Sequence, residues 1–315
     1  MTDNDGQWER GLIEKLATSA LREQRRSRMW GIFFKLLGFA YLTILLMLAL
    51  GWSDKSMEVT GGKHTALVEL NGLIAPGGDV SAEKVGRALR AAFKDKNTQG
   101  VVLRINSPGG SPVQAQNIYD EMRRLRTKYP NIPLYAVVED ICASGGYYVA
   151  AAADKIYVTR SSIVGSIGVR MDSFGVTGLM DKLGVERRLL TAGKNKGFLD
   201  PFLPEDAKQK EFAQAMLDEI HQQFIGDVRQ GRGKRLKETP DMFSGLIWTG
   251  QQSVDLGLAD GFGTLEYVAR DVIKADEIVD YTQKENIAEK FARRFGASAA
   301  NALAELAIRY SPTIR

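Results

Sequence analysis

The chain has 315 residues, of which 44% are hydrophobic and 25% are charged, as expected for a folded protein rather than a disordered one. The net charge of +4 is small for this length and the basic residues are scattered without interleaved aromatics, which argues against nucleic-acid binding. The single cysteine, Cys142, excludes an internal disulfide bond and a cysteine-based metal site. The two histidines, His64 and His221, leave few candidates for histidine chemistry.

A long apolar segment lies near the N-terminus, at residues 29–52. Lys35 is its one charged residue, and Trp30 and Trp52 stand near its two ends, where interfacial aromatic side chains occur. The segment is long enough to cross a hydrocarbon core of about 30 Å. A cleaved signal peptide is the alternative, but it would start near residue 1 and end in an A-x-A site, which this segment lacks. We therefore predict an uncleaved transmembrane anchor.

The charges before this anchor predict its orientation. Arginines at positions 22, 25, 26 and 28 are opposed only by Glu23. Because positive residues stay in the cytoplasm, residues 1–28 are predicted to be a cytoplasmic tail. Residues 53–63 then form a linker, and the rest of the chain lies on the outer side of the membrane.

After the linker, apolar runs of strand length alternate with helical patterns. The predicted strands are 64–74, 101–105, 133–139, 156–159 and 185–191, and the predicted helices are 81–93, 112–128, 145–153, 171–183 and 205–229. This alternation predicts an α/β fold with βαβ units and a mainly parallel sheet.

Two helical segments carry amphipathic patterns. In 205–229, Phe212, Met216, Ile220 and Phe224 recur at four-residue steps, which predicts a stripe packed on the core or on a neighbouring subunit. A further amphipathic helix is predicted near the C-terminus, at 284–308.

A glycine-containing turn, RINSPGGSP at 104–112, follows a predicted buried strand. Pro108 fixes one backbone position, and Gly109 and Gly110 allow backbone angles that residues with a Cβ avoid. Such a turn can present amide N–H groups to an oxyanion. From this segment alone, an ordinary strand–helix turn is the favoured explanation.

A second turn, in EDICASGGYYVAAAAD at 139–154, ends a strand and opens a helix of small residues. Ser144 would lie at the start of that helix, where the dipole favours a developing negative charge. A serine that only caps the helix is the alternative, but the small flanking residues keep this hydroxyl approachable. Cys142 is expected to be a small buried residue rather than a nucleophile. The segment therefore indicates Ser144 as a nucleophile.

A serine hydroxyl needs a base to become a good nucleophile. His64 precedes the first strand and His221 lies mid-helix among polar residues, so neither has the surroundings of a catalytic partner. The remaining candidate is a lysine held neutral by burial. The segment at 189–202, LLTAGKNKGFLDPF, offers Lys194 and Lys196, although by itself it is typical of a solvated basic loop.

Five segments together resemble the signal peptide peptidase A family, the Ser–Lys relatives of the Clp protease proteolytic subunit within the crotonase-like superfamily. They are INSPGG at 105–110, ASGGYY at 143–148, GSIGV at 165–169, AGKNK at 192–196 and WTGQQSVDLGLAD at 248–260. They occur in the family's order, and the resemblance covers about residues 64–275. It implies a ββα superhelix like that of crotonase and Clp protease. The remaining residues, 276–315, are expected from their pattern to form a C-terminal amphipathic helical tail.

The resemblance also implies roles for individual residues. Ser144 matches the family's nucleophile, Lys196 its general base and Ser166 a serine that orients the lysine. Gly110 and Gly145 match the amide donors of the oxyanion hole. Lys194 matches no required position.

Two positions depart from the family's pattern. Ser253 stands where alanine is usual, and Gly245–Leu246 replaces a common Gly–Arg pair. Both are far in sequence from the predicted dyad, so we expect them to affect local packing or assembly rather than chemistry.

The resemblance implies a serine endopeptidase of the bacterial inner membrane that degrades cleaved signal peptides and similar apolar peptides. It implies a homo-oligomer with sites built from more than one subunit, and neither a metal nor an organic cofactor. An acyl-CoA hydratase or isomerase of the crotonase type is one alternative, although such enzymes carry acidic residues over the site. A non-catalytic membrane scaffold with the same fold is the other.

Overall fold

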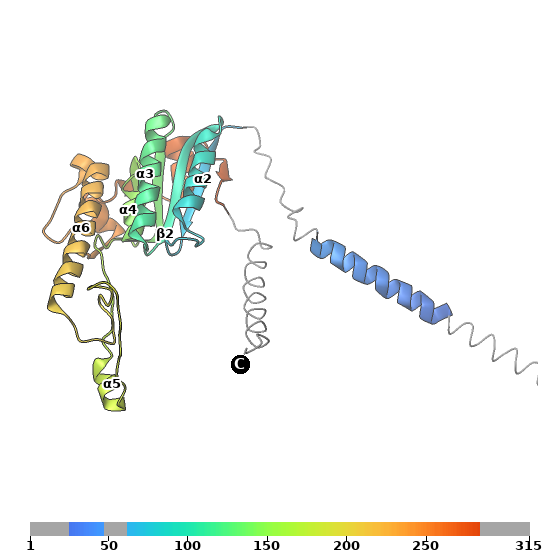
Figure 1. The fold of residues 1–315 in the computed structure, drawn as a ribbon. Coiled ribbons are helices and arrows are strands. Elements are labelled where there is room, and N and C mark those ends of the chain that lie inside the picture. The colour runs from blue at the N-terminus through green and yellow to red at the C-terminus, as the bar shows by residue number, and fades with distance from the viewer. Residues whose placement is uncertain (1–24, 47–61, 284–315) are drawn as a thin grey trace, which may run out of the picture. The chain divides into compact units, whose positions relative to one another are not determined.

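The computed structural model describes residues 25–46 and 62–283, which belong to two separate units (Figure 1). The first contains a helix, Arg25–Leu46, of 22 residues with a hydropathy of 1.8 in its most apolar window. By length and composition this helix could cross a membrane, as predicted for 29–52. The end of that anchor, most of the linker and of the N-terminal tail, and the predicted helix at 284–308 lie outside the described residues.

The second unit, within 62–283, is built on an eight-stranded sheet of order β6-β5-β3-β2-β1-β8, with β4 pairing to β3 and β7 pairing to β4. The strands are β1 (His64–Asn71), β2 (Thr98–Ser107), β3 (Leu134–Ala143), β4 (Lys155–Val158), β5 (Ile163–Gly165), β6 (Ile247–Thr249), β7 (Gly261–Phe262) and β8 (Ile278–Asp280). Every pairing is parallel except that of β5 with β6. The predicted mainly parallel α/β fold is confirmed.

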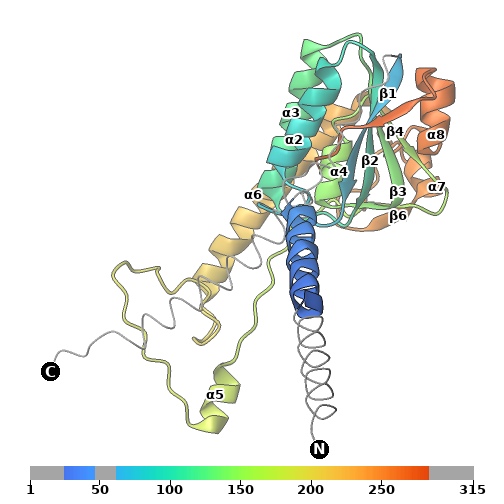
Figure 2. The same ribbon diagram turned by 90° about the vertical axis from the view of Figure 1, so that its right-hand side faces the viewer.

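Helices cover both faces of this sheet. They are α2 (Ala82–Lys94), α3 (Pro112–Lys128), α4 (Gly145–Ala150), α5 (Thr177–Leu183), α6 (Ala207–Arg232), α7 (Gly250–Asp255) and α8 (Leu265–Tyr267), with short turns at Gly233–Arg235 and Val268–Ile273. In Figure 2 the sheet lies between α2 and α3 on one side and α8 on the other. Alternate strand residues serve the two sides: Val68 and Leu103 belong to the core with α2 and α3, and Val102 to the smaller core beside α8.

Strand β3 changes its partner along its length. Residues 135–137 pair with β4, whereas residues 141–143 pair with β5. The pairing of β3 with β2 is also irregular between Ile105 and Ser107. As a result, the last residues of β2, β3 and β5 meet just before Ser144.

Between β5 and α6 the chain leaves the sheet as an arm, residues 168–206, which carries α5 away from the strands (Figures 1 and 2). The predicted helix at 171–183 is formed only from Thr177, and the predicted strand at 185–191 is not formed. Leu190 is 96% exposed, so the apolar residues that suggested a strand have no sheet to join within this chain. The strand prediction here was wrong because a strand needs a partner as well as a pattern.

Helix α6 differs between its two ends. Phe224, near its C-terminal end, is 3% exposed, whereas Phe212, near its N-terminal end, is 66% exposed. Only the C-terminal part of the predicted stripe therefore packs on the core. At the other edge of the sheet, β8 lies within the span predicted as a helical tail and pairs instead with β1.

Candidate active site

Ser144 lies in the sharp turn between β3 and α4. Its backbone has φ 51° and ψ −123°, a conformation that is strained for a residue with a Cβ. The turn is held by the Ser144 amide, which donates to the Gly165 carbonyl at 2.8 Å, and by the Ser144 carbonyl, which accepts from the Tyr148 amide at 3.0 Å. The Ser144 side chain makes no capping hydrogen bond to α4. The alternative of a serine that only caps its helix therefore loses support.

The glycine turn after β2 lies directly against Ser144. A Cβ added to Gly109, whose φ is 100°, would be 2.8 Å from the Ser144 Cβ and 2.7 Å from the Gly145 amide nitrogen. A Cβ on Gly110 would overlap the carbonyl of Ile74. Glycine is thus required at both positions by close approach as well as by backbone angle.

Ser107 fixes the shape of this turn. Its buried hydroxyl accepts from the Gly109 amide at 3.1 Å and donates to the Gly72 carbonyl at 2.6 Å. This serine is part of the INSPGG segment, but its role could not be assigned from the sequence because Gly72 lies on a different loop.

Two backbone amides face the region of the serine. The Gly110 nitrogen is 3.3 Å from the position that a Cβ on Gly145 would occupy. Within residues 62–283, neither the Gly110 nor the Gly145 N–H donates a hydrogen bond to the chain. Unused N–H groups beside a nucleophile are the arrangement that stabilises an oxyanion.

Ser166 follows β5 and lies in the same region. Its φ is 50°, and its amide donates to the Leu246 carbonyl at 2.7 Å. Because Gly165 accepts from the Ser144 amide, the segment that holds Ser166 is next to the turn that holds Ser144. The structure thus brings together four of the five predicted site residues.

The departure at Gly245–Leu246 lies closer to the site than its sequence position suggested. Leu246 supplies the carbonyl that binds the Ser166 amide, and a Cβ on Gly168 would be 3.2 Å from the Gly245 Cα. This departure is therefore close to the candidate site in space although it is far in sequence, since β6 pairs with β5 across a long connection.

Lys196 is not part of this cluster. It is exposed and lies in a tight turn of the arm, in which its amide donates to the Gly193 carbonyl at 3.1 Å. The turn is attached to the N-terminal part of α6, because the Leu199 amide donates to Gln209 at 2.8 Å and Phe198 contacts Phe212 edge to face.

The length of α6 separates this turn from Ser144. Gln209 and Phe224 are 15 residues apart, or about 22 Å along a helix axis. Phe224 stacks on Tyr148 of α4, the helix that begins next to Ser144. The lysine turn and the serine are therefore at opposite ends of this stretch of α6. The expectation of a desolvated lysine beside Ser144 is not met within one chain.

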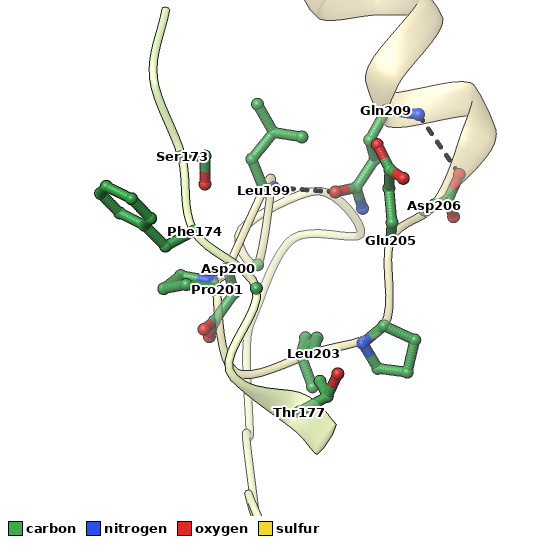
Figure 3. A pocket seen from close by; sticks show the side chains of 13 residues that line it. Ser173, Phe174, Thr177, Leu199, Asp200, Pro201, Leu203, Glu205, Asp206 and Gln209 are labelled. Atoms are coloured by element: carbon green, nitrogen blue, oxygen red, sulfur yellow. Dashed lines mark hydrogen bonds between the residues drawn. The ribbon is translucent and has the colours of Figure 1, made fainter. Parts of the chain in front are cut away.

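A cavity of about 350 Å³ lies in the arm rather than at Ser144 (Figure 3). It is enclosed by Ser173–Thr177, the turn that ends at Pro204 and the start of α6. Its acidic side chains already have partners: Asp206 caps α6, and Asp200 accepts from the Phe202 amide and from Arg187. These bonds hold the pKa of Asp200 below its usual value. The polar lining thus stabilises the arm itself.

No hydrogen bond joins Ser144 to the other candidate groups within residues 62–283. His64 begins β1, and because β1, β2 and β3 are parallel, it lies at the opposite edge of the sheet from the end of β3. His221 contacts the Ile167 carbonyl through Nε2 at 3.0 Å. Cys142 is fully buried, and burial raises the pKa of its thiol, so it is not an available nucleophile.

Family models match most of the sheet domain. Residues 126–278 match the model of peptidase family S49, and residues 72–164 match that of Clp protease. A protein of Methanocaldococcus jannaschii described as a protease is 33% identical over 270 residues, which are 81% of this chain and 85% of that protein. An Enterococcus faecium protein named after the signal peptide peptidase SppA is 30% identical over 71% of this chain and 67% of its own length.

A Brucella abortus protein named as the Na(+)/H(+) antiporter NhaA is 46% identical over 209 residues, which are 65% of this chain. The chain spans only 28% of the length of that protein. A second protein of that name, from Brucella melitensis, shows the same partial coverage. The name of these relatives therefore describes proteins much longer than the matched segment.

Proposed function

Because this chain belongs to peptidase family S49, we propose that it is a membrane-anchored serine endopeptidase with Ser144 as nucleophile and Lys196 as general base. The observation that carries the proposal is the meeting of three turns at Ser144. There, a hydroxyl that does not cap its helix lies beside the unused amides of Gly110 and Gly145. A peptide carbonyl placed between them would meet its nucleophile and its oxyanion donors together.

The general base is supplied by a second copy of the chain in this proposal. Lys196 is exposed near the N-terminal end of α6, and the arm around it carries apolar side chains that its own chain leaves in solvent, including Phe174 and Leu190. An adjacent copy that covers this arm would bury the lysine and favour its neutral amine. Since the serine region and the arm are different surfaces, the contact is head-to-tail and can close into a ring.

The proposed reaction has two halves. Neutral Lys196 accepts the Ser144 proton while the hydroxyl oxygen attacks the peptide carbonyl, and the amides of Gly110 and Gly145 bind the oxyanion. The ammonium then protonates the leaving amine, which gives an acyl-enzyme. Water attacks this ester with Lys196 again as base. Ser166 holds the lysine amine in place by a hydrogen bond.

The substrates we propose are cleaved signal peptides and similar apolar segments at the membrane. The apolar helix Arg25–Leu46 and the relative named after a signal peptide peptidase support this. In the proposed topology the N-terminus is cytoplasmic and the catalytic domain lies on the outer side of the inner membrane. A reporter fused after residue 60 should then read as outside, and a cytoplasmic reading would contradict the topology.

The nucleophile is tested with a serine-directed phosphonate probe on the detergent-solubilised full chain. We expect one labelled peptide containing Ser144, and no labelling of a Ser144→Ala variant that remains folded by circular dichroism. Labelling that persists in Ser144→Ala would contradict the proposal and direct attention to another serine.

A further inference from the structure

Helix α6 is clamped to α4 by several contacts near its C-terminal end. The Phe224 and Tyr148 rings are stacked, with centroids 4.5 Å apart and planes 11° apart. The Tyr148 hydroxyl donates to the Asp227 carboxylate. Burial and this carboxylate raise the pKa of Tyr148, so its hydroxyl keeps its proton and remains a donor.

Two more contacts close the clamp. At Gly231 the helices are so near that a Cβ would overlap the Ala151 carbonyl. One residue later, the fully buried Arg232 donates to Asp260 at 2.7 Å and to the Gly257 carbonyl. The C-terminal part of α6 is therefore held both to α4 and to the segment before β7.

The opposite part of α6 has no such support. Between Ala207 and Ile220, Ala213 is the one buried residue, and the contacts of this part include the lysine turn, through Gln209 and Phe212. The helix continues unbroken from this turn to the clamp. If the angle between α6 and α4 changes at the clamp, the lysine turn at the other end of the helix moves with it.

We infer that α6 acts as a rigid strut and that Tyr148 and Asp227 are positioning residues for Lys196, although they lie at the other end of the helix. This inference rests on the proposed function, in which Lys196 enters the site of a neighbouring copy. The clamp fixes the angle of the strut on the copy that donates the lysine. The same α4 carries that copy's own Ser144 at its start, so one clamp sets the spacing of both catalytic groups.

The length of the strut makes the clamp sensitive. Over a lever of about 22 Å, a tilt of roughly 3° would move the lysine turn by about 1 Å. A displacement of about 1 Å at a catalytic group can lower a rate by about 100-fold. Because only the position of the general base would change, the loss should appear in kcat rather than in KM.

Co-assembly of two inactive full-length variants can show whether the clamp acts in the subunit that donates the lysine or in the subunit that donates the serine. In a mixture of Ser144→Ala and Lys196→Ala subunits, active sites form only where the first donates the lysine and the second donates the serine. Asp227→Ala is then added to one subunit type at a time. We expect a 10- to 100-fold lower kcat when it is on the lysine donor, and less than about a threefold change when it is on the serine donor.

Two further variants serve as controls for this experiment. Asp218→Ala removes a carboxylate from the exposed part of α6, where it accepts from Gln214 on the same helix. It should leave kcat unchanged whether it is placed on the lysine donor or on the serine donor. Gly231→Ala should reproduce the lysine-donor defect by forcing α6 away from α4, even where Asp227→Ala folds poorly. A defect that follows the serine donor, or both donors equally, would overturn the inference. Absence of activity in the unmodified mixture would instead contradict the dyad shared between copies.

Discussion

The serine region and the lysine arm differ in how far one chain completes them. Around Ser144, three turns from distant parts of the sequence interlock so closely that glycine is required at Gly109 and Gly110. Around Lys196, the arm exposes Phe174 and Leu190 and has no sheet to join. The contacts that shape the serine region are made within one chain, whereas the lysine arm exposes the kind of apolar surface that a further copy would cover. This difference is what the proposed site, shared between two copies, would require.

The largest expected effects come from the dyad itself. Ser144→Ala should lower kcat about 10⁴-fold or more, because no other group can form the acyl-enzyme. Lys196→Arg should be as inactive as Lys196→Ala, since a guanidinium stays protonated and cannot act as a base. Lys194→Ala is the matched control and should remain close to wild type in a peptide-cleavage assay. An active Lys196→Arg enzyme would remove the lysine from the mechanism.

The next effect concerns the glycine turn. Gly110→Ala should lower kcat about 100- to 1000-fold, because the Cβ would push the turn away from Ile74 and displace an oxyanion donor. Gly77→Ala is the control: its φ of 70° is also positive, but no atom lies within 4 Å of the added Cβ. Steady-state kinetics should show full kcat for Gly77→Ala, with only a loss of stability. Equal kinetics for the two variants would argue against an oxyanion role for Gly110.

Paired apolar substitutions sharpen the contrast between core and arm. Leu103→Ala, in the fully buried centre of β2, should lower the free energy of unfolding by about 2–5 kcal/mol. Leu190→Ser, in the arm, should change it by less than about 0.5 kcal/mol in a dissociated chain. The same arm variant should lower the molar mass seen by light scattering and lower activity with it. Unchanged mass and activity for Leu190→Ser would show that the arm is not an interface.

The smallest expected effect is a loss of stability in acid. Although burial raises it, the hydrogen bond and charge of Arg232 hold the pKa of Asp260 below its ordinary value of 3.8. A carboxyl with a lowered pKa stabilises the fold above its ordinary value, and this stabilisation is lost as the pH falls through the lowered one. The thermal midpoint of the wild type should therefore fall below about pH 4. The thermal midpoint of Asp260→Asn should be lower at neutral pH and should fall less in acid. If the thermal midpoint of this variant had the same pH dependence as that of the wild type, the assignment would be contradicted.

The parts predicted well from the sequence are those governed by local rules. Alternation and turn residues located β1, β2, β3, α2, α3 and two of the three turns that meet at Ser144. The short strands β5, β6, β7 and β8 were missed because each has only two or three residues and is defined by pairing with other segments. The arm was misjudged for the opposite reason, since Leu190 and its neighbours carry a strand pattern without a partner in the chain.

The site divides in the same way. Ser144, Gly110 and Gly145 lie in turns that end predicted strands. Ser166 was assigned only from the resemblance, because β5, the strand before it, was not predicted. The distance of Lys196 from these residues could not be predicted, because it depends on how far α6 continues beyond its last contact with the core. The roles of Leu246 and Asp227 were missed as well. Their contacts to Ser166 and Tyr148 join segments about 80 residues apart, and such contacts are determined by tertiary packing.

The central claim is that one copy supplies the serine and the next supplies the lysine. The most direct measurement is peptide cleavage by a co-expressed, co-purified mixture of Ser144→Ala and Lys196→Ala chains, each inactive alone. Random head-to-tail pairing should restore activity at about a quarter of the sites. Activity at that level would support the shared site. A mixture that assembles with the wild-type mass but stays inactive would contradict it and place both groups of each dyad on one chain.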